Sequence, residues 1–168
     1  MAGPEVHIDV ARQQLHLMLD GATLRTYPVS TALNGMGEHN SSGCTPRGLH
    51  RVRAKVGAGC APGTVFVGRR ATGEIHSSAL AAQHPGRDWI LSRILWLTGN
   101  RGGAVDTLRR YIYIHGCPDD CPMGVPRSHG CVRMTNADVI DLFDRVVAGT
   151  RVCIHSTQTP GLMEGAAP

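Results

Sequence analysis

Two short segments of this 168-residue sequence pair a histidine with a cysteine in a setting suited to covalent chemistry. The run Tyr111–Ile114 is rich in aromatic and β-branched residues, which predicts a strand that carries His115 at its end. Cys131 closes the run Ser128–Cys131, which reads Ser-His-Gly-Cys. A thiol becomes a strong nucleophile when an imidazole takes its proton and later gives that proton to a leaving amine. The pattern therefore predicts Cys131 as nucleophile and His115 as general base.

The glycine before the cysteine supports the same interpretation. Gly130 leaves the backbone uncluttered, so we expect amide groups around Gly130 and Cys131 to point at a developing oxyanion. A histidine or a cysteine taken alone is more often structural than catalytic. It is their joint appearance in this order that favours catalysis.

This arrangement resembles the catalytic domain of the L,D-transpeptidase family, the YkuD type. The family motif is a strand-end histidine, a loop, then Ser/Thr-His-Gly-Cys, an apolar residue, and Asn or Arg. Here the matching residues are His115, Gly116 and Ser128–Arg133. The similarity covers nearly the whole chain, because upstream segments also look like the family's first strands and its Thr-Pro-x-Gly turn: Ile8–Val10, Gln14-Leu15, Asp20-Gly21, Tyr27–Thr31 and Thr45–Gly48.

The resemblance implies a role for each matching position. Cys131 is expected to be the nucleophile and His115 the general base, with the backbone carbonyl of Gly116 orienting the imidazole. Ser128 is expected to support the turn that carries the cysteine, together with Gly130.

The implied substrate is the stem tetrapeptide of peptidoglycan or a muropeptide, and no cofactor is implied. His129 and Arg133 are expected to shape the site and to hold a substrate carboxylate. The bond attacked follows the L-centre of the diamino acid at the third position, so that D-alanine leaves and an acyl-enzyme forms. An amine acceptor then makes a cross-link, as in an L,D-transpeptidase, whereas water makes the enzyme an L,D-carboxypeptidase.

Two other interpretations use the same residues. Cys117 and Cys121, with His115, His129 and Cys131, offer sulfur and nitrogen ligands for a zinc-stabilised binding module. Their spacing is a weak match to the close pairs of a zinc knuckle. A peptidoglycan-binding domain without catalysis is disfavoured, because both reactive residues are present.

The elements that position these residues are mostly strands. The alternation in Val6–Val10 and Leu15–Leu19, the turn at Asp20-Gly21 and the run Leu24–Val29 predict an antiparallel meander. We expect a mainly β fold, an antiparallel β-sandwich or open barrel of the L,D-transpeptidase catalytic domain type, with one or two packed helices. Further strands are expected at these runs: Leu49–Val56, Thr64–Gly68, Trp89–Leu97 (a helix being the alternative there) and Val152–His155.

The clearest helix is expected after Asn136, a candidate cap, with an apolar stripe that ends at Val147. A helical turn is expected at Ala79–His84. We expect one catalytic domain over residues 1–157 and a flexible tail over 158–168. Residues 71–110 look longer than a minimal domain needs, and we expect them to cover the site and restrict the acceptor.

Charge and cysteine content bear on partners and location. The net charge is +4 and the basic residues are scattered, which argues against a nucleic-acid partner. The sequence has no apolar run long enough to span a bilayer, so we expect no membrane partner. The first residues do not look like a secretory signal, and the sequence holds six cysteines, so we expect a cytoplasmic L,D-carboxypeptidase of peptidoglycan recycling. The alternative is an exported transpeptidase. Outside the site, we expect small buried thiols at Cys44, Cys60 and Cys153.

Overall fold

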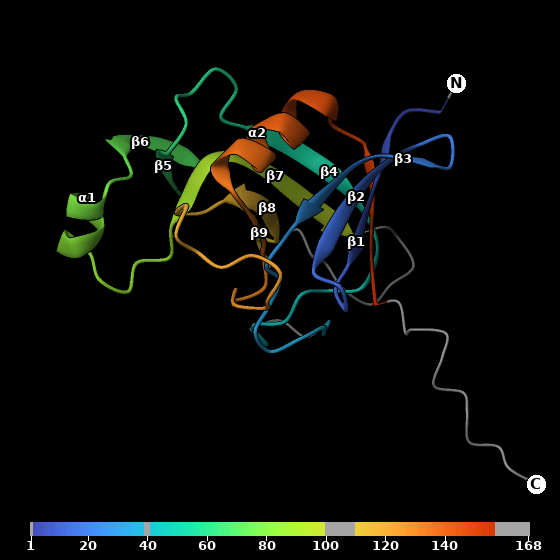
Figure 1. The fold of residues 1–168 in the computed structure, drawn as a ribbon, viewed down its shortest axis with the longest axis horizontal. Coiled ribbons are helices and arrows are strands. Elements are labelled where there is room, and N and C mark those ends of the chain that lie inside the picture. The colour runs from blue at the N-terminus through green and yellow to red at the C-terminus, as the bar shows by residue number, and fades with distance from the viewer. Residues whose placement is uncertain (1, 39–40, 100–109, 157–168) are drawn as a thin grey trace, which may run out of the picture.

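The computed structural model describes residues 2–38, 41–99 and 110–156, and its strands form one large open sheet with a helix packed on it (Figure 1). The predicted mainly β fold is confirmed. The described elements, in chain order, are β1 (Glu5–Asp9), β2 (Gln14–Leu19), β3 (Ala22–Pro28), β4 (Gly48–Val56), β5 (Thr64–Val67), β6 (Arg70–Ile75), α1 (Ser78–Gln83), β7 (Ile90–Gly99), β8 (Tyr113–Gly116), β9 (Val132–Met134), α2 (Asn136–Arg145) and β10 (Arg151–His155).

The strands follow the order β3-β2-β1-β10-β4-β7-β5-β6, and β8 branches from β7 to pair with β9. β1, β2 and β3 form the expected antiparallel meander. Asp20 and Gly21 turn between β2 and β3 with φ values of 50° and 79°, the left-handed region that a tight hairpin requires. The sheet is mixed, because β1 pairs with β10 and β8 pairs with β9 in the parallel direction.

The core lies between the sheet and α2, which packs on β7 and β8 (Figure 1). Val139, Leu142 and Phe143 are the side chains that α2 buries. Lys55, the chain's only lysine, reaches the end of this helix from β4. Its Nζ donates hydrogen bonds of 2.6 Å to the carbonyl of Phe143 and 2.7 Å to that of Val146. The cation thereby satisfies carbonyls that the helix leaves unpaired at its C-terminal end.

The boundaries of α2 differ from the prediction at both ends. Thr135 is the cap, because its hydroxyl accepts a hydrogen bond from the amide of Asp138, whereas Asn136 is the first helical residue. The helix ends at Arg145, two residues before Val147. Val147 is 66% exposed, so its place in the predicted apolar stripe was wrong. The predicted helical turn at Ala79–His84 corresponds to α1.

The strand predicted from Tyr111 begins two residues later. Tyr111 has φ 54°, outside the extended region of a regular strand, and its ring stacks on Trp96 with centroids 6.1 Å apart. β6 and β9 were not predicted. Three cysteines expected to be buried are only half-buried: Cys44, Cys60 and Cys153.

Some expectations lie outside the described residues, namely the flexible tail over 158–168 and the part of 71–110 that spans 100–109. Among the described residues, no helix has the length and apolar character needed to cross a membrane.

Candidate active site

β8 and β9 carry the predicted nucleophile and base to one face of the sheet. The two strands run parallel, with Ile114 beside Val132 and His115 beside Arg133. Ile114 and Val132 are fully buried in the main core. Because side chains alternate along a strand, His115 and the residue before β9, Cys131, point to the opposite face.

His115 is held by its neighbour in the chain. Its side chain is buried, and Nδ1 lies 2.7 Å from the carbonyl oxygen of Gly116. A carbonyl only accepts hydrogen bonds, so Nδ1 carries the proton and Nε2 is the basic nitrogen. Burial lowers the pKa of His115, and the hydrogen bond to Gly116 opposes this less strongly. The imidazole is therefore neutral at pH 7 and ready to accept a proton.

The Cys131 side chain packs against a small apolar cluster of Phe66, Ile94 and Tyr113. Its Sγ lies 3.3 Å from the amide nitrogen of Tyr113 and 3.5 Å from the carbonyl oxygen of Tyr111. Burial raises the pKa of Cys131 to about 11, although the Tyr113 amide lowers it in part. The resting thiol is therefore protonated, and ionisation has to accompany the reaction.

The turn that carries the cysteine is fixed by two hydroxyl groups. Ser128 Oγ donates a 2.5 Å hydrogen bond to the carbonyl of Cys131 and accepts one of 3.2 Å from the amide of Gly130. Thr45 Oγ1 donates a 3.0 Å hydrogen bond to the Gly130 carbonyl. Gly130 has φ 133°, and a Cβ there would lie 3.1 Å from the carbonyl oxygen of Cys44. Conformation and crowding therefore both call for glycine.

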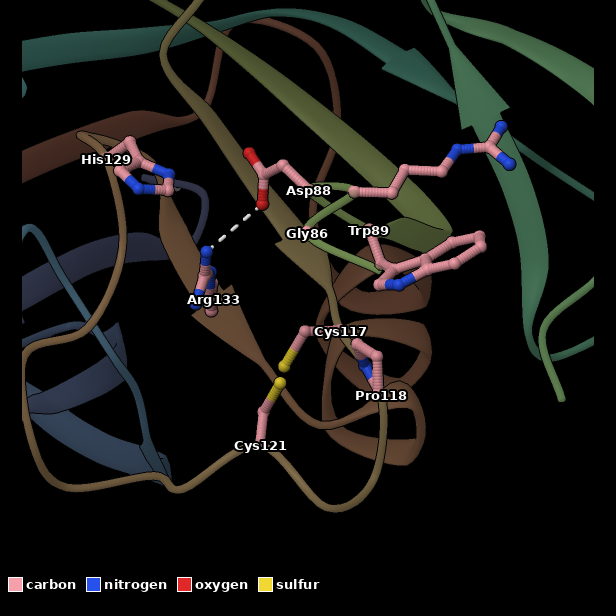
Figure 2. Close-up of a pocket in the computed structure, with 9 residues that line it drawn as sticks. Gly86, Asp88, Trp89, Cys117, Pro118, Cys121, His129 and Arg133 are labelled. Carbon is pink, nitrogen blue, oxygen red and sulfur yellow. Dashed lines mark hydrogen bonds and ion pairs between the residues drawn. The ribbon is translucent and has the colours of Figure 1, made fainter. Parts of the chain in front are cut away.

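Beside this turn, Arg133 forms an ion pair with Asp88 (Figure 2). The distance from Nη2 to the carboxylate oxygen is 3.0 Å, and the Arg133 side chain is only 15% exposed. Both residues line a pocket of about 170 Å³, a volume suited to one side-chain-sized group rather than to a whole peptide. The pocket is lined by Gly86, Arg87, Asp88, Trp89, Cys117, Pro118, Cys121, His129 and Arg133.

His129 lies between this pocket and a second one. The second pocket is also lined by Cys44, Arg110 and Tyr111. The imidazole of His129 is exposed, so a ligand in either pocket can reach it. The structure thus brings all the sequence-predicted site residues into one region, with His129 and Arg133 at its rim.

Asn136 ties the loop after His115 to the rest of the sheet. Its Nδ2 donates to the carbonyl of Cys117 at 3.1 Å, and its Oδ1 accepts a 2.5 Å hydrogen bond from Ser92. Ser92 has φ 70° and lies at the irregularity of β7. Gly116 lies in the same crowded place, where a Cβ would be 2.6 Å from a backbone carbonyl oxygen of β7.

Sequence reasoning missed three polar residues at the site: Asp88, Thr45 and Asn136. Thr45 lies in the turn that resembles the family, but its contact with Gly130 joins residues 85 positions apart. Asp88 carries no motif, and only its place in the long 71–110 region pointed toward the site. Asn136 was noted only as a helix cap.

The zinc interpretation finds no support in the described part of the chain. There, no three histidine, cysteine, aspartate or glutamate side chains gather as metal ligands. Cys131 faces Tyr111 and Tyr113, whereas Cys117 and Cys121 lie at the wall of the Asp88–Arg133 pocket.

Residues 3–160 match the YkuD family, described as the L,D-transpeptidase catalytic domain. An L,D-transpeptidase from Xylanimonas cellulosilytica has a similar fold, with 26% identity, a TM-score of 0.52, and coverage of 92% of this chain and 61% of that one. An L,D-transpeptidase from Mycobacterium smegmatis is 22% identical with a TM-score of 0.54, and the match covers 92% of this chain and 60% of that one. L,D-transpeptidase 3 from Mycobacterium tuberculosis is 18% identical with a TM-score of 0.57, and the match covers 92% of this chain and 62% of that one.

No curated protein matches the chain. The chain spans about three-fifths of the length of these solved relatives. The two Mycobacterium enzymes, at 22% and 18% identity, show only that the fold is shared. The family match, in contrast, extends over nearly the whole sequence and includes the histidine and cysteine that the strands bring together. This chain belongs to the L,D-transpeptidase catalytic domain family.

Proposed function

We propose that this protein is a cysteine acyltransferase that cleaves the bond between the third-position diamino acid and D-alanine in peptidoglycan stem tetrapeptides. The observation that carries the proposal is the 2.7 Å contact between His115 Nδ1 and the Gly116 carbonyl. This contact leaves Nε2 as the base on the face of the sheet that Cys131 shares.

In the proposed reaction, Sγ of Cys131 attacks the carbonyl carbon of the diamino acid while Nε2 of His115 takes the thiol proton. Because the pKa of the thiol is raised to about 11, proton transfer accompanies attack rather than preceding it. The amide of Gly130 is engaged by Ser128, so the Cys131 amide is our candidate donor to the oxyanion. His115 then gives its proton to the leaving amine of D-alanine, and a thioester remains on the enzyme.

We propose Arg133 as the group that receives a substrate carboxylate. Its guanidinium lies on the same face as His115, in a pocket of a size suited to a single substituent. Asp88 occupies the guanidinium here, so the incoming carboxylate would have to replace that ion pair. His129, between the two pockets, is placed to contact the substrate on either side of the attacked bond.

We propose water as the acceptor, which makes the protein an L,D-carboxypeptidase of peptidoglycan recycling in the cytoplasm. The six cysteines, all thiols in the described structure, favour a reducing compartment. Soluble tetrapeptide fragments are the substrate there, and water is the abundant nucleophile. An L,D-transpeptidase that joins stem peptides by an amine acceptor is the second candidate, because the family name describes that reaction.

Mass spectrometry of a purified tetrapeptide after incubation, with and without an amine acceptor, tests the reaction. We expect tripeptide and free D-alanine in both cases, with no product from the Cys131→Ala variant. Cross-linked product as the main species would reject hydrolysis and leave the nucleophile intact. Fractionation of cells and muropeptide analysis of a deletion strain test the location: accumulated cytoplasmic tetrapeptides agree with it, and lost wall cross-links alone contradict it.

A second test uses a mimic of the acyl donor. The L,D-transpeptidase 3 of Mycobacterium tuberculosis has been solved with a faropenem-derived adduct. We expect a penem or carbapenem to acylate Cys131, because its strained amide offers the thiol an electrophilic carbonyl. Intact-protein mass without an adduct, under conditions where the tetrapeptide is cleaved, would contradict this expectation.

A further inference from the structure

Cys117 and Cys121 take no part in the proposed reaction, yet they face each other beside the active site. Figure 2 shows their sulfur atoms pointing toward one another at the wall of the pocket that holds Asp88 and Arg133. The chain between them forms a tight turn, closed by a 2.9 Å hydrogen bond from the Cys121 amide to the Pro118 carbonyl. The turn therefore fixes the approach of the two thiols.

The two thiols differ in access to solvent. Cys117 is 1% exposed, and its Sγ lies 3.4 Å from the carbonyl oxygen of Met134. Cys121 is half-buried and lines both this pocket and a neighbouring one. Burial raises the pKa of Cys117, and the adjacent Cys121 thiol raises it further. Cys121 is thus the sulfur that a solute can reach, and Cys117 is the protected partner behind it.

The turn begins close to the predicted catalytic histidine in the chain and is anchored there. Cys117 follows Gly116, whose carbonyl holds His115, and Asn136 binds both the Cys117 carbonyl at 3.1 Å and the Asp119 carboxylate at 3.0 Å. These contacts fix the backbone on the Cys117 side. Because the Cys117 side is held, the movement that closes a bond between the two sulfurs falls to Cys121.

We propose that Cys117 and Cys121 form a reversible dithiol–disulfide site that exchanges with low-molecular-weight disulfides such as oxidised glutathione, while Cys131 stays a free thiol. The thiolate of Cys121 attacks one sulfur of the reagent, forms a mixed disulfide and releases one reduced thiol. Cys117 then loses its proton and attacks the Cys121 sulfur, and a second reduced thiol leaves. The pair gives up two electrons and two protons, and the reagent is reduced to two thiols.

Cys131 is placed differently. Its Sγ lies between backbone groups of Tyr111 and Tyr113 and packs against apolar side chains, and its raised pKa keeps it protonated. Exchange requires a thiolate, so Cys131 reacts slowly with a disulfide. The pair therefore takes up oxidant next to the nucleophile before the nucleophile itself does.

Peptide mapping tests the proposal directly, because trypsin separates the relevant thiols. Cleavage at arginines gives the peptide 111–127 with Cys117 and Cys121, and the peptide 128–133 with Cys131. The folded protein is incubated with a series of oxidised glutathione concentrations, then denatured in iodoacetamide so that every remaining thiol is alkylated, and digested. We expect peptide 111–127 to lose the mass of two hydrogens while peptide 128–133 still carries the alkyl group of a free thiol, and dithiothreitol to reverse the change.

Two variants serve as controls. Cys121→Ser should leave Cys117 unmodified by glutathione, because the remaining thiol is buried, whereas Cys153→Ser should leave the pair's oxidation unchanged. The proposal is overturned if Cys131 is glutathionylated at a lower concentration of oxidised glutathione than the one at which Cys117 and Cys121 form their disulfide. It is equally overturned if Cys121 keeps a glutathione adduct without closure. The assay needs no turnover, so its result is independent of the proposed enzymatic function.

Discussion

Asp88 and Arg133 lie 3.0 Å apart across the pocket beside the cysteine turn, although 44 residues separate them in the chain. Arg133 comes from β9, whereas Asp88 lies just before β7, in the long region 71–110 that we expected to cover the site. The Asp88 carboxylate is paired with the same guanidinium that we propose as the binding group for a substrate carboxylate. An internal acid thus competes with the substrate for the same cation.

This competition predicts opposite effects for the two partners. Asp88→Asn should lower KM for a tetrapeptide several-fold, because Arg133 no longer has a bound carboxylate to give up. Arg133→Gln should raise KM about 10-fold, in line with the loss of a charge-assisted hydrogen bond. Asp144→Asn, an exposed change on α2, is the control and should leave KM unaltered. Steady-state kinetics of the three variants decide the matter, and a raised KM for Asp88→Asn would contradict the competition.

The second prediction concerns the nucleophile and its base. Cys131→Ala should abolish turnover. His115→Ala should lower kcat about 10²- to 10⁴-fold, because the thiol loses its proton acceptor and the leaving amine its donor. Cys153→Ala, on β10, which β4 and β7 separate from β8 in the sheet, should keep most activity. Circular dichroism melts of each variant separate lost chemistry from lost folding, and full activity of Cys131→Ala would reject the mechanism.

Gly116→Ala tests the packing that holds the histidine. The added methyl group would meet the carbonyl oxygen of Leu91 at 2.6 Å and Oδ1 of Asn136 at 2.9 Å. We expect a loss of about 1–3 kcal/mol in the free energy of unfolding, the usual result of overpacking, and a fall in kcat as the ring of His115 shifts. Urea unfolding and kinetics measure the two effects. Gly3→Ala, where a Cβ meets nothing within 4 Å, is the matched control.

The fourth prediction is the pH dependence of the Cys131 thiol in the free enzyme. Since burial raises its pKa to about 11, only about one thiol in ten thousand is ionised at pH 7. Alkylation of Cys131 by iodoacetamide should therefore keep rising with pH through 9 and level off only near 11. Mass spectrometry of peptide 128–133 follows the rate. A plateau near neutral pH would mean a preformed thiolate–imidazolium pair instead.

The raised pKa of Cys131 also predicts how the stability of the protein changes with pH. A thiol with a raised folded-state pKa holds its proton longer in the native protein than in the unfolded chain. Stability from Cys131 is thus fully present below the unfolded pKa of about 8.5 and declines as pH rises toward 11. Wild type should lose more stability than Cys131→Ala over this alkaline window.

The sequence by itself determined the features that rest on short-range pattern. Alternating apolar residues predicted the β1–β2–β3 meander, and the helical stripe around Val139 and Leu142 predicted α2, because burial of one face imposes a period of two or 3.6 residues. The run Ser128–Cys131 and the strand-end His115 indicated the family, which the match over residues 3–160 confirms. The roles assigned to these residues stay proposals.

Only the tertiary structure decided which distant residues meet. The parallel pairing of β8 with β9 sets His115 beside Arg133, and no local pattern encodes the register of two strands separated by a loop. The same holds for Thr45, which bonds to the Gly130 carbonyl, and for Asp88, which pairs with Arg133. Such contacts join single polar groups at long sequence separation. They depend on how the strands and loops are placed in space, which the chain's local periodicity does not record.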